Sequence, residues 1–169
     1  MPPLSIMIKP ASSLCNMRCR YCFYHDVVEQ RDVQSFGVMS EETADSLIRK
    51  ALQFANGESV AFAFQGGEPL IAGLGFFRSF VSKVQRYNVR SSPIYFSLQT
   101  NGTLVTEEWA EFFKENGFLI GLSLDGDFNN NRFRVDDKGN NTFYKILSTA
   151  QLFKSKGVEF NILTVLTGN

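Results

Sequence analysis

Five short apolar segments, separated by longer amphipathic ones, constrain the fold of this 169-residue chain more than any other feature. They are rich in β-branched and aromatic residues, and their length and composition are typical of β-strands. They read as nearly continuous hydrophobic runs, which favours a parallel sheet covered by helices. The segments are residues 4–8, 59–64, 94–98, 118–124 and 158–166.

Four helical patterns lie between these expected strands. The first begins after Ser40, whose hydroxyl can cap a helix and which two glutamates follow, and its apolar residues recur at helical spacing as far as Ala55. The other three contain Phe77–Val84, Trp109–Phe113 and Phe143–Phe153. The alternation predicts an α/β fold, a parallel-sheet partial (β/α) barrel of about five strands, with ligand sites at the carboxyl ends of the strands.

The fifth apolar segment has no helix after it. Its unpaired edge would invite pairing with another chain, so a longer barrel is the natural continuation. We therefore expect residues 1–169 to form one core domain, an incomplete barrel truncated after the fifth strand, with the C-terminal part missing.

Charge and composition exclude several classes of partner. The chain has 17 basic and 17 acidic residues, so no basic field indicates nucleic acid or an anionic membrane. No apolar run approaches the ~20 residues of a membrane span, and prolines interrupt the N-terminal segment. A cytoplasmic protein is expected, in a compartment that keeps thiols reduced.

All three cysteines lie within eight residues, "CNMRCRYC", directly after the first expected strand. Their odd number and short spacing argue against disulfides. Thiolates select zinc or iron–sulfur clusters, and Cys15, Cys19 and Cys22 would leave one iron of a four-iron cubane without a protein ligand. His25 would complete a Cys₃His zinc set, but structural zinc sites usually take ligand pairs from two separated segments. The spacing favours the cluster, and a zinc-binding interaction module is the alternative.

The C-x₃-C-x₂-C loop, with Tyr21 before the last cysteine, resembles the signature of the radical S-adenosylmethionine (SAM) enzymes. The resemblance implies that the three cysteines ligate a [4Fe–4S] cluster whose open iron is chelated by the amino and carboxylate groups of SAM, with Tyr21 also at the cofactor. Reductive cleavage of SAM would then yield a 5′-deoxyadenosyl radical. The protein would position the cofactor and exclude water and oxygen.

Two further segments carry the same resemblance. Gly66, Gly67 and Glu68 follow the second strand and resemble the family's GGE motif, in which glycines allow close backbone approach and Glu68 offers an acceptor to an ammonium group. Ser123 and Arg134, at and beyond the fourth strand, match positions that contact polar groups of SAM. A guanidinium suits a carboxylate because it can donate two parallel hydrogen bonds. A simpler interpretation of Gly66 and Gly67 is that they only form a turn, and a simpler interpretation of the arginine is that it is solvated at the surface. Arg132 is the alternative to Arg134.

A finer resemblance, over essentially the whole chain, is to the anaerobic sulfatase-maturating enzymes. It implies an oxidoreductase that converts a cysteine or serine of a sulfatase to formylglycine, with a peptide or protein substrate and an external electron donor. Tyr24 and Gln65 would lie on the substrate side of the cofactor, although a core aromatic and a strand-end amide are simpler interpretations. The segments that carry it are residues 8–25, 62–69, 97–104, 121–126 and 158–163.

The chain differs from the sulfatase-maturating enzymes at several points. Residues 127–139 are one residue shorter than expected and carry Asn130 where relatives often have histidine, and the further cysteine clusters and the catalytic base of the subgroup are absent. Another radical SAM peptide-modifying enzyme, or a domain that holds cluster and cofactor without turnover, is an alternative function.

Overall fold

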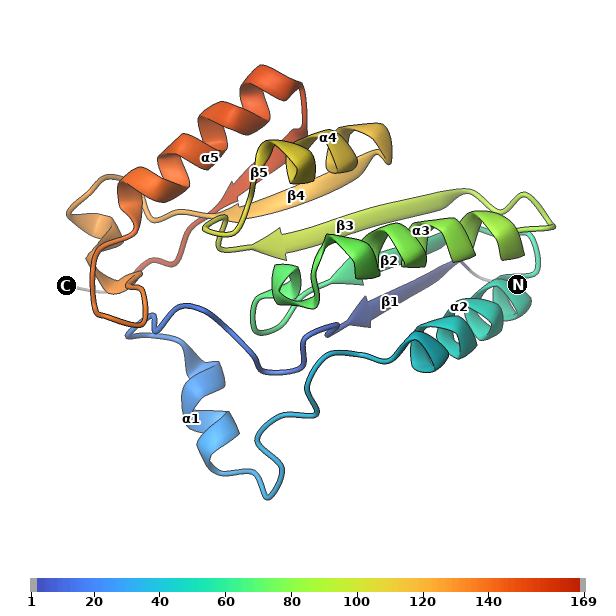
Figure 1. Ribbon diagram of the computed structural model, residues 1–169, viewed down its shortest axis with the longest axis horizontal. Coiled ribbons are helices and arrows are strands. Elements are labelled where there is room, and N and C mark those ends of the chain that lie inside the picture. The colour runs from blue at the N-terminus through green and yellow to red at the C-terminus, as the bar shows by residue number, and fades with distance from the viewer. Residues whose placement is uncertain (1–2, 168–169) are drawn as a thin grey trace.

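The computed structural model describes residues 3–167, without the side chains of residues 25, 26 and 29. Its five strands are all parallel and follow one another in chain order across one sheet, which confirms the predicted α/β class (Figure 1). The strands are β1 Leu4–Ile8, β2 Val60–Phe64, β3 Ile94–Thr100, β4 Phe118–Ser123 and β5 Glu159–Leu163. The helices are α1 Phe23–Glu29, α2 Glu41–Ala55, α3 Leu74–Tyr87, α4 Glu107–Glu115 and α5 Phe143–Lys156, with 3₁₀ turns η1 Pro69–Ala72 and η2 Asn130–Phe133.

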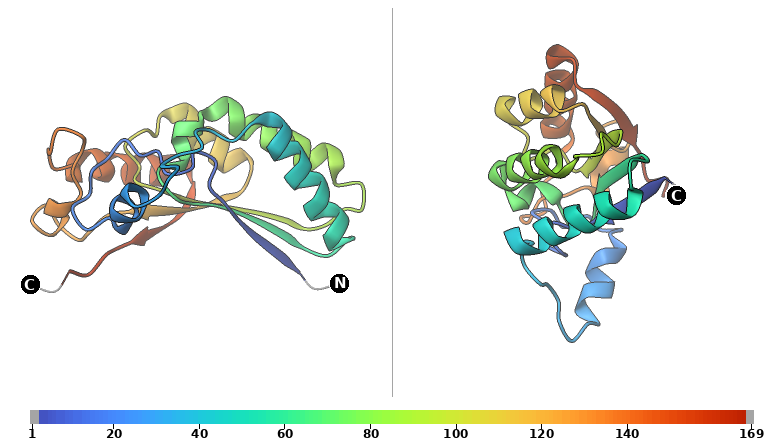
Figure 2. Two further views of the ribbon diagram at one scale, coloured as in Figure 1. Left: turned by 90° about the horizontal axis from the view of Figure 1, so that it is seen from below. Right: turned by 90° about the vertical axis from the view of Figure 1, so that its right-hand side faces the viewer.

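Helices α2 to α5 cover one face of the curved sheet (Figure 2). In the described part of the chain the concave face carries no such layer, and Met7 and Tyr95 are 63% and 62% exposed. The sheet therefore has the curvature and strand order of part of a barrel wall, with helices outside.

Phenylalanine dominates the core between sheet and helices. Phe62 and Phe64 of β2 meet Phe77 and Phe80 of α3 through edge-to-face ring contacts with centroids 5.0–5.3 Å apart. Phe118 of β4 continues this layer toward α4. Edge-to-face pairs place the positive ring edge on the negative face of the neighbour, which adds to the gain from burial.

The helices begin and end where their sequences allow. Ser40 and Thr106 cap α2 and α4 by accepting hydrogen bonds from the backbone N–H of Thr43 and Trp109. Helix α5 ends at Gly157, whose φ of 67° lies in the left-handed region that glycine adopts readily.

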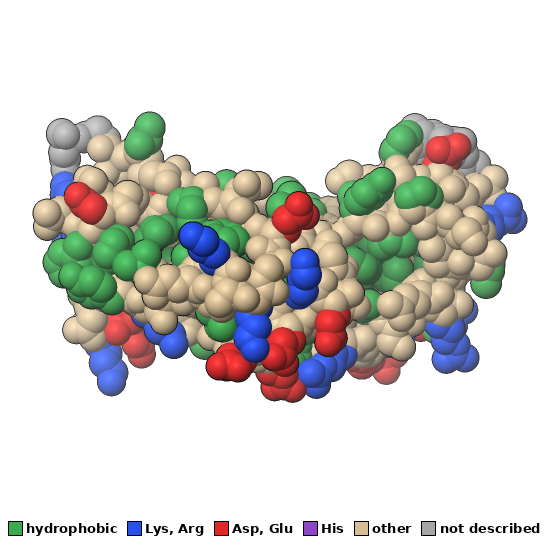
Figure 3. All heavy atoms as spheres, turned by 90° about the horizontal axis from the view of Figure 1, so that it is seen from above, with side chains coloured by type: hydrophobic (Ala, Val, Ile, Leu, Met, Phe, Trp, Pro, Cys, Tyr) green, Lys and Arg blue, Asp and Glu red, His purple; other side chains and the backbone are tan. Residues whose placement is uncertain are grey.

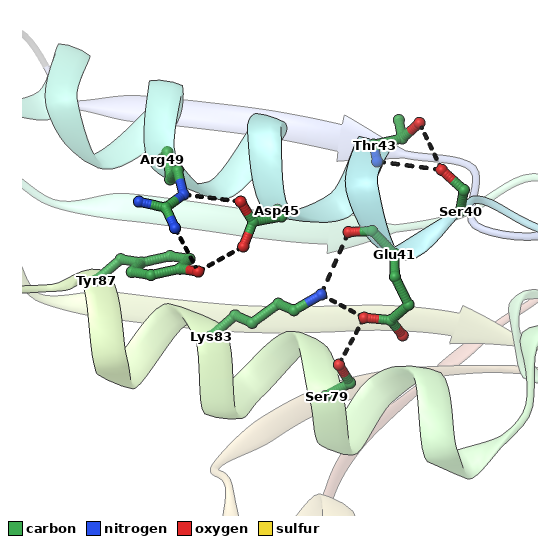
Figure 4. A network of polar contacts seen from close by, with 8 residues as sticks. All are labelled: Ser40, Glu41, Thr43, Asp45, Arg49, Ser79, Lys83 and Tyr87. Atoms are coloured by element: carbon green, nitrogen blue, oxygen red, sulfur yellow. Dashed lines mark hydrogen bonds and ion pairs between the residues drawn. The ribbon is translucent and has the colours of Figure 1, made fainter.

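Polar side chains join α2 to α3 on the outer surface (Figure 4). Tyr87 donates a hydrogen bond to Asp45, while Arg49 contacts both of them. Lys83 pairs with Glu41. Because these groups are largely solvated, such pairs contribute little to stability, and the apolar faces beneath hold the helices.

Figure 3 shows a hollowed outline, with acidic and basic side chains intermingled along the edge opposite the hollow. No strong field of one sign extends along that edge, in keeping with the balanced charge of the chain. A search of the described residues finds no helix long and apolar enough to cross a membrane.

Helix α1 is the element that the sequence analysis missed. It is only seven residues long, and Cys22 at its N-cap offers no capping hydrogen bond, so neither periodicity nor a cap marks it. The predicted strand ends also shift: β3 extends to Thr100, and β5 is confined to Glu159–Leu163.

Replacing Phe64 by alanine should lower the free energy of unfolding by about 3–5 kcal/mol, because Phe64 is only 1% exposed and its loss leaves a cavity between β2 and α3. The control is Phe36→Ala. Phe36 is 84% exposed, so the free energy of unfolding of this variant should stay within about 0.5 kcal/mol of the wild-type value. Urea titrations followed by circular dichroism measure both. Equal losses would contradict this account of the core.

Candidate active site

A cavity of about 270 Å³ lies at the carboxyl ends of the strands. Its lining contains the residues favoured from the sequence as cluster, cofactor or substrate contacts: Cys15, Cys19, Tyr21, Cys22, Tyr24, Gln65, Gly66, Gly67, Glu68, Ser123 and Arg134. Most of these residues come from the loops after β1, β2 and β4, while Tyr24 lies in α1 and Ser123 ends β4; a parallel sheet brings all of these segments to one edge. Arg132, the alternative to Arg134, is exposed and lies outside this lining, with its guanidinium over Phe133.

The cysteine loop is fastened to the loop after β4. The backbone N–H groups of Arg18 and Arg20 donate to the carbonyls of Val135 and Phe133, each at 2.9 Å, and the fully buried Met17 bridges to Asp136. The three thiols are free and half-buried. They therefore lie in a loop whose backbone is tied down on both sides of Cys19.

Burial raises the pKa of the Cys15 thiol to about 11, and it also raises the pKa of Cys19, against the opposing effect of Arg134. These thiols are therefore protonated at neutral pH, and a metal centre would displace their protons on binding. Among the described residues, no three His, Cys, Asp or Glu side chains converge on the position of a single metal ion, whereas a four-iron cluster places each thiolate on a different iron. The side chain of His25, the candidate fourth zinc ligand, lies outside the described residues.

Glu68 is completely buried and holds the loops after β2 and β3 together. Its Oε1 accepts hydrogen bonds from Leu70 N–H and the Thr100 hydroxyl, and its Oε2 accepts one from Asn101 N–H at 2.8 Å. Its own N–H donates to the carbonyl of Leu14 at 2.7 Å. Three protein donors thus reach its carboxylate, which holds the loop that the glycines shape, and its role as an acceptor for an ammonium group stays a prediction.

Gly67 is required by a close approach of two backbones. A Cβ at this position would stand 2.3 Å from the carbonyl oxygen of Leu14, immediately before Cys15, and its φ is +55°. At Gly66 the neighbour is the flexible side chain of Lys9, which can move aside. Gly67 therefore lets the loop after β2 lie directly against the cysteine loop.

Asn101 joins the cysteine loop to β3 and was not nominated from the sequence. Its Nδ2 donates to Asn16 Oδ1 at 3.0 Å and lies 3.9 Å from the Cys15 sulfur, while its Oδ1 accepts from Thr103. The segment "QTNG" after the third strand marked this loop as part of the rim, but nothing in it distinguished a side chain facing a cysteine from an ordinary turn residue.

Arg134 is 7% exposed, and its Nη2 donates to Asp125 Oδ1 at 2.9 Å. Its buried Nε has no hydrogen-bond partner in the described structure. A buried donor without an acceptor is costly. Because Arg134 also lines the cavity, its permanent positive charge would attract an anionic ligand there. Arg134 is therefore suited to an anionic group, with part of its donor set already committed to Asp125.

Tyr24 and Gln65 lie on the same cavity wall as the cysteines. The Tyr24 ring packs on Phe23 with centroids 4.3 Å apart, and the Lys9 ammonium lies 4.8 Å from its centre. Gln65 N–H continues the β1–β2 ladder by donating to Ile8. Their backbones are thus fixed while both residues line the cavity.

The fold and the site together define a class: a parallel partial barrel whose strand-end loops gather three free thiols and an arginine with an unpaired nitrogen around one cavity. A sequence model of the Radical SAM superfamily matches residues 10–169, and the chain belongs to this superfamily.

The relatives and solved structures extend beyond this chain. The cysteine-type anaerobic sulfatase-maturating enzyme of Clostridium perfringens (strain ATCC 13124) is 51% identical over all of this chain and 46% of its own length. The structure "Native anSMEcpe with bound AdoMet" is 50% identical, with a TM-score of 0.90 over 96% of this chain and 44% of that chain. The same protein "with bound AdoMet and Cp18Cys peptide" gives 49% identity and a TM-score of 0.88 over 96% and 43%. The chain spans about half the length of the relatives it matches.

Gly67→Ala should displace the Leu14 carbonyl and loosen the cysteine loop. We expect a loss of about 1–3 kcal/mol in the free energy of unfolding and faster alkylation of Cys15. Urea titration and mass spectrometry of the alkylated peptides measure these effects. The matched control is Gly75→Ala in α3, where no atom lies within 4 Å of the added Cβ. It should leave the alkylation rate of Cys15 unchanged and the free energy of unfolding unchanged or slightly higher. Unchanged alkylation in Gly67→Ala would contradict the close approach.

Burial raises the pKa of Glu68 from 4.5 to about 7, although three hydrogen bonds oppose the rise. Between these pH values the folded chain retains a proton that the unfolded chain releases, so this group should make the free energy of unfolding fall as pH rises from about 4.5 to about 7. The Glu68→Gln variant should lack this contribution to the pH dependence of the free energy of unfolding. Urea midpoints across this range test it, and identical pH slopes for the two proteins would show that folding leaves the pKa of Glu68 unchanged.

Proposed function

We propose that this chain is the cluster- and SAM-binding part of a radical SAM oxidoreductase that matures sulfatases, converting a cysteine or serine to formylglycine. The observation that carries the proposal is the convergence of Cys15, Cys19, Cys22, the Gly66–Gly67 turn and Arg134 on one cavity. In this proposal residues 1–169 form a single radical SAM core domain.

The three cysteines would hold a [4Fe–4S] cluster. Thiolate is the ligand type that such clusters take, and three thiolates leave one iron free for SAM. The loop suits this role because its thiols are free and its backbone is tied to the loop after β4. When bound, the reduced cluster and SAM supply hydrogen-atom abstraction chemistry.

The remaining lining residues would hold SAM. The Gly66–Gly67 backbone, kept in place by Glu68, would face its ammonium group, and the guanidinium of Arg134 would donate to its carboxylate. Tyr21 and the buried Ser123 complete that wall. These residues orient the cofactor and keep water from it.

A peptide substrate would enter beside Tyr24 and Gln65, which line the cavity without coordinating the cluster. Support for a peptide comes from the similar structure that holds one, and support for a sulfatase comes from the name of the similar enzyme. An external electron donor would reduce the cluster. We place the protein in the cytoplasm, where reducing conditions keep the three thiols available.

Anaerobic reconstitution with iron and sulfide should give a brown protein with about four irons per chain, measured by iron analysis and electron paramagnetic resonance. Cys15→Ala, Cys19→Ala and Cys22→Ala should each lose the cluster, because two thiolates leave two irons exposed. His25→Ala is the control and should retain wild-type iron.

The wild-type protein should also bind SAM in an anaerobic calorimetric titration, and dithionite should release 5′-deoxyadenosine from it. A colourless protein with one zinc that His25→Ala removes would instead establish the zinc module. Iron retention in all three cysteine variants would refute the assignment of ligands.

A further inference from the structure

Asp125, two residues beyond the end of β4, is a buried carboxylate with three donors. Its side chain is 3% exposed. Oδ1 accepts hydrogen bonds from Arg134 Nη2 and Val165 N–H, both at 2.9 Å, and Oδ2 accepts one from the Tyr21 hydroxyl. No role for Asp125 follows from the thiols, the glycines or the cavity lining, from which it is absent.

These three donors come from three different loops. Tyr21 belongs to the cysteine loop and precedes Cys22, Arg134 follows η2, and Val165 follows β5. Tyr21 also lies under the guanidinium, with the Arg134 carbon 5.4 Å from its ring centre. One side chain therefore sets the relative position of the cysteine loop and the arginine.

Asp125 also balances the charge of Arg134. The Arg134 side chain is 8% exposed, so without a carboxylate partner its cation would be buried and uncompensated. Nη2 donates to Asp125 at 2.9 Å and to the Leu163 carbonyl at 3.5 Å, so the guanidinium plane has a defined orientation in which Asp125 supplies the shorter contact and the charged partner. A rigid plane matters because a guanidinium binds a carboxylate well only in the plane of its N–H groups.

We propose that Asp125 is a positioning residue for the cofactor: it holds Arg134 and Tyr21 so that the guanidinium meets the carboxylate of SAM. This inference rests on the proposed function and adds to it the residue that orients the carboxylate contact. Asp125 does not touch the cofactor in this scheme; it acts through Arg134, and the cysteine loop shares its anchor through Tyr21.

The test compares SAM with decarboxylated SAM, which lacks only the carboxylate. Dissociation constants for both are measured by anaerobic calorimetry on the reconstituted protein. Asp125→Asn keeps the size of the side chain but removes its charge, so it should weaken SAM binding at least tenfold and decarboxylated SAM binding less than twofold to threefold. Arg134→Gln should show the same selective loss, and the double variant should add little to it.

Asp136→Asn is the matched control. Asp136 lies in the same loop and also accepts three hydrogen bonds, from Lys138 and Asn140, but it does not line the cavity. Its affinities for both compounds should equal those of the wild type. Equal losses for both compounds in Asp125→Asn, or tighter SAM binding because an unpaired Arg134 attracts the carboxylate more strongly, would overturn the positioning role.

Two further variants keep the test decisive if Asp125→Asn does not fold. Tyr21→Phe removes one donor and keeps the ion pair, and it should lower the preference for SAM over decarboxylated SAM at least threefold. The Asp125→Asn, Arg134→Gln double variant has no unpaired buried charge, and its preference should match that of Arg134→Gln. An unchanged preference in Tyr21→Phe, or a double variant that differs from Arg134→Gln, would refute the inference. A wild-type protein that binds neither compound would refute the proposed function itself.

Discussion

A buried carboxylate must collect hydrogen-bond donors from its surroundings, and two such groups organise the carboxyl edge of this sheet. Glu68 joins the loops after β1, β2 and β3, through the Leu14 carbonyl, Leu70 and Asn101. Asp125 joins the cysteine loop to the segments after β4 and β5. Every strand-end loop is thus connected to one of two buried acidic side chains, and the cysteine loop is connected to both.

This arrangement explains how a loop that carries three thiols can be ordered without forming a strand or a long helix. The residues between Ile8 and Cys22 make few regular backbone pairs among themselves. Their donors and acceptors are instead satisfied by neighbouring loops, at Glu68, Asn101 and residues 133–136. A site built in this way is preorganised, because its side chains are oriented before any cofactor arrives.

The phenylalanine core stabilises the fold and offsets the free-energy cost of such a site. Buried charges and an unpaired guanidinium nitrogen cost free energy, whereas the rings packed between the sheet and α3 and α4 are held by burial and edge-to-face contacts. The exposed ion pairs between α2 and α3 add little to that balance. Stability and chemistry therefore lie in different layers of the molecule: helices and core on one side of the sheet, strand-end loops along its carboxyl edge.

The sequence by itself determined the α/β class, the parallel sheet and the location of the site, because strand periodicity and motif order are local patterns. It also nominated the three thiols, the glycines, Ser123 and Arg134 as neighbours, since parallel strands bring their carboxyl ends to one edge. Only the tertiary structure decided that Glu68 is occupied by protein donors, that Asn101 faces Cys15 and that Asp125 pairs with Arg134. Hydrogen-bond partners separated by many residues depend on how loops pack, and no local pattern of residues specifies that packing.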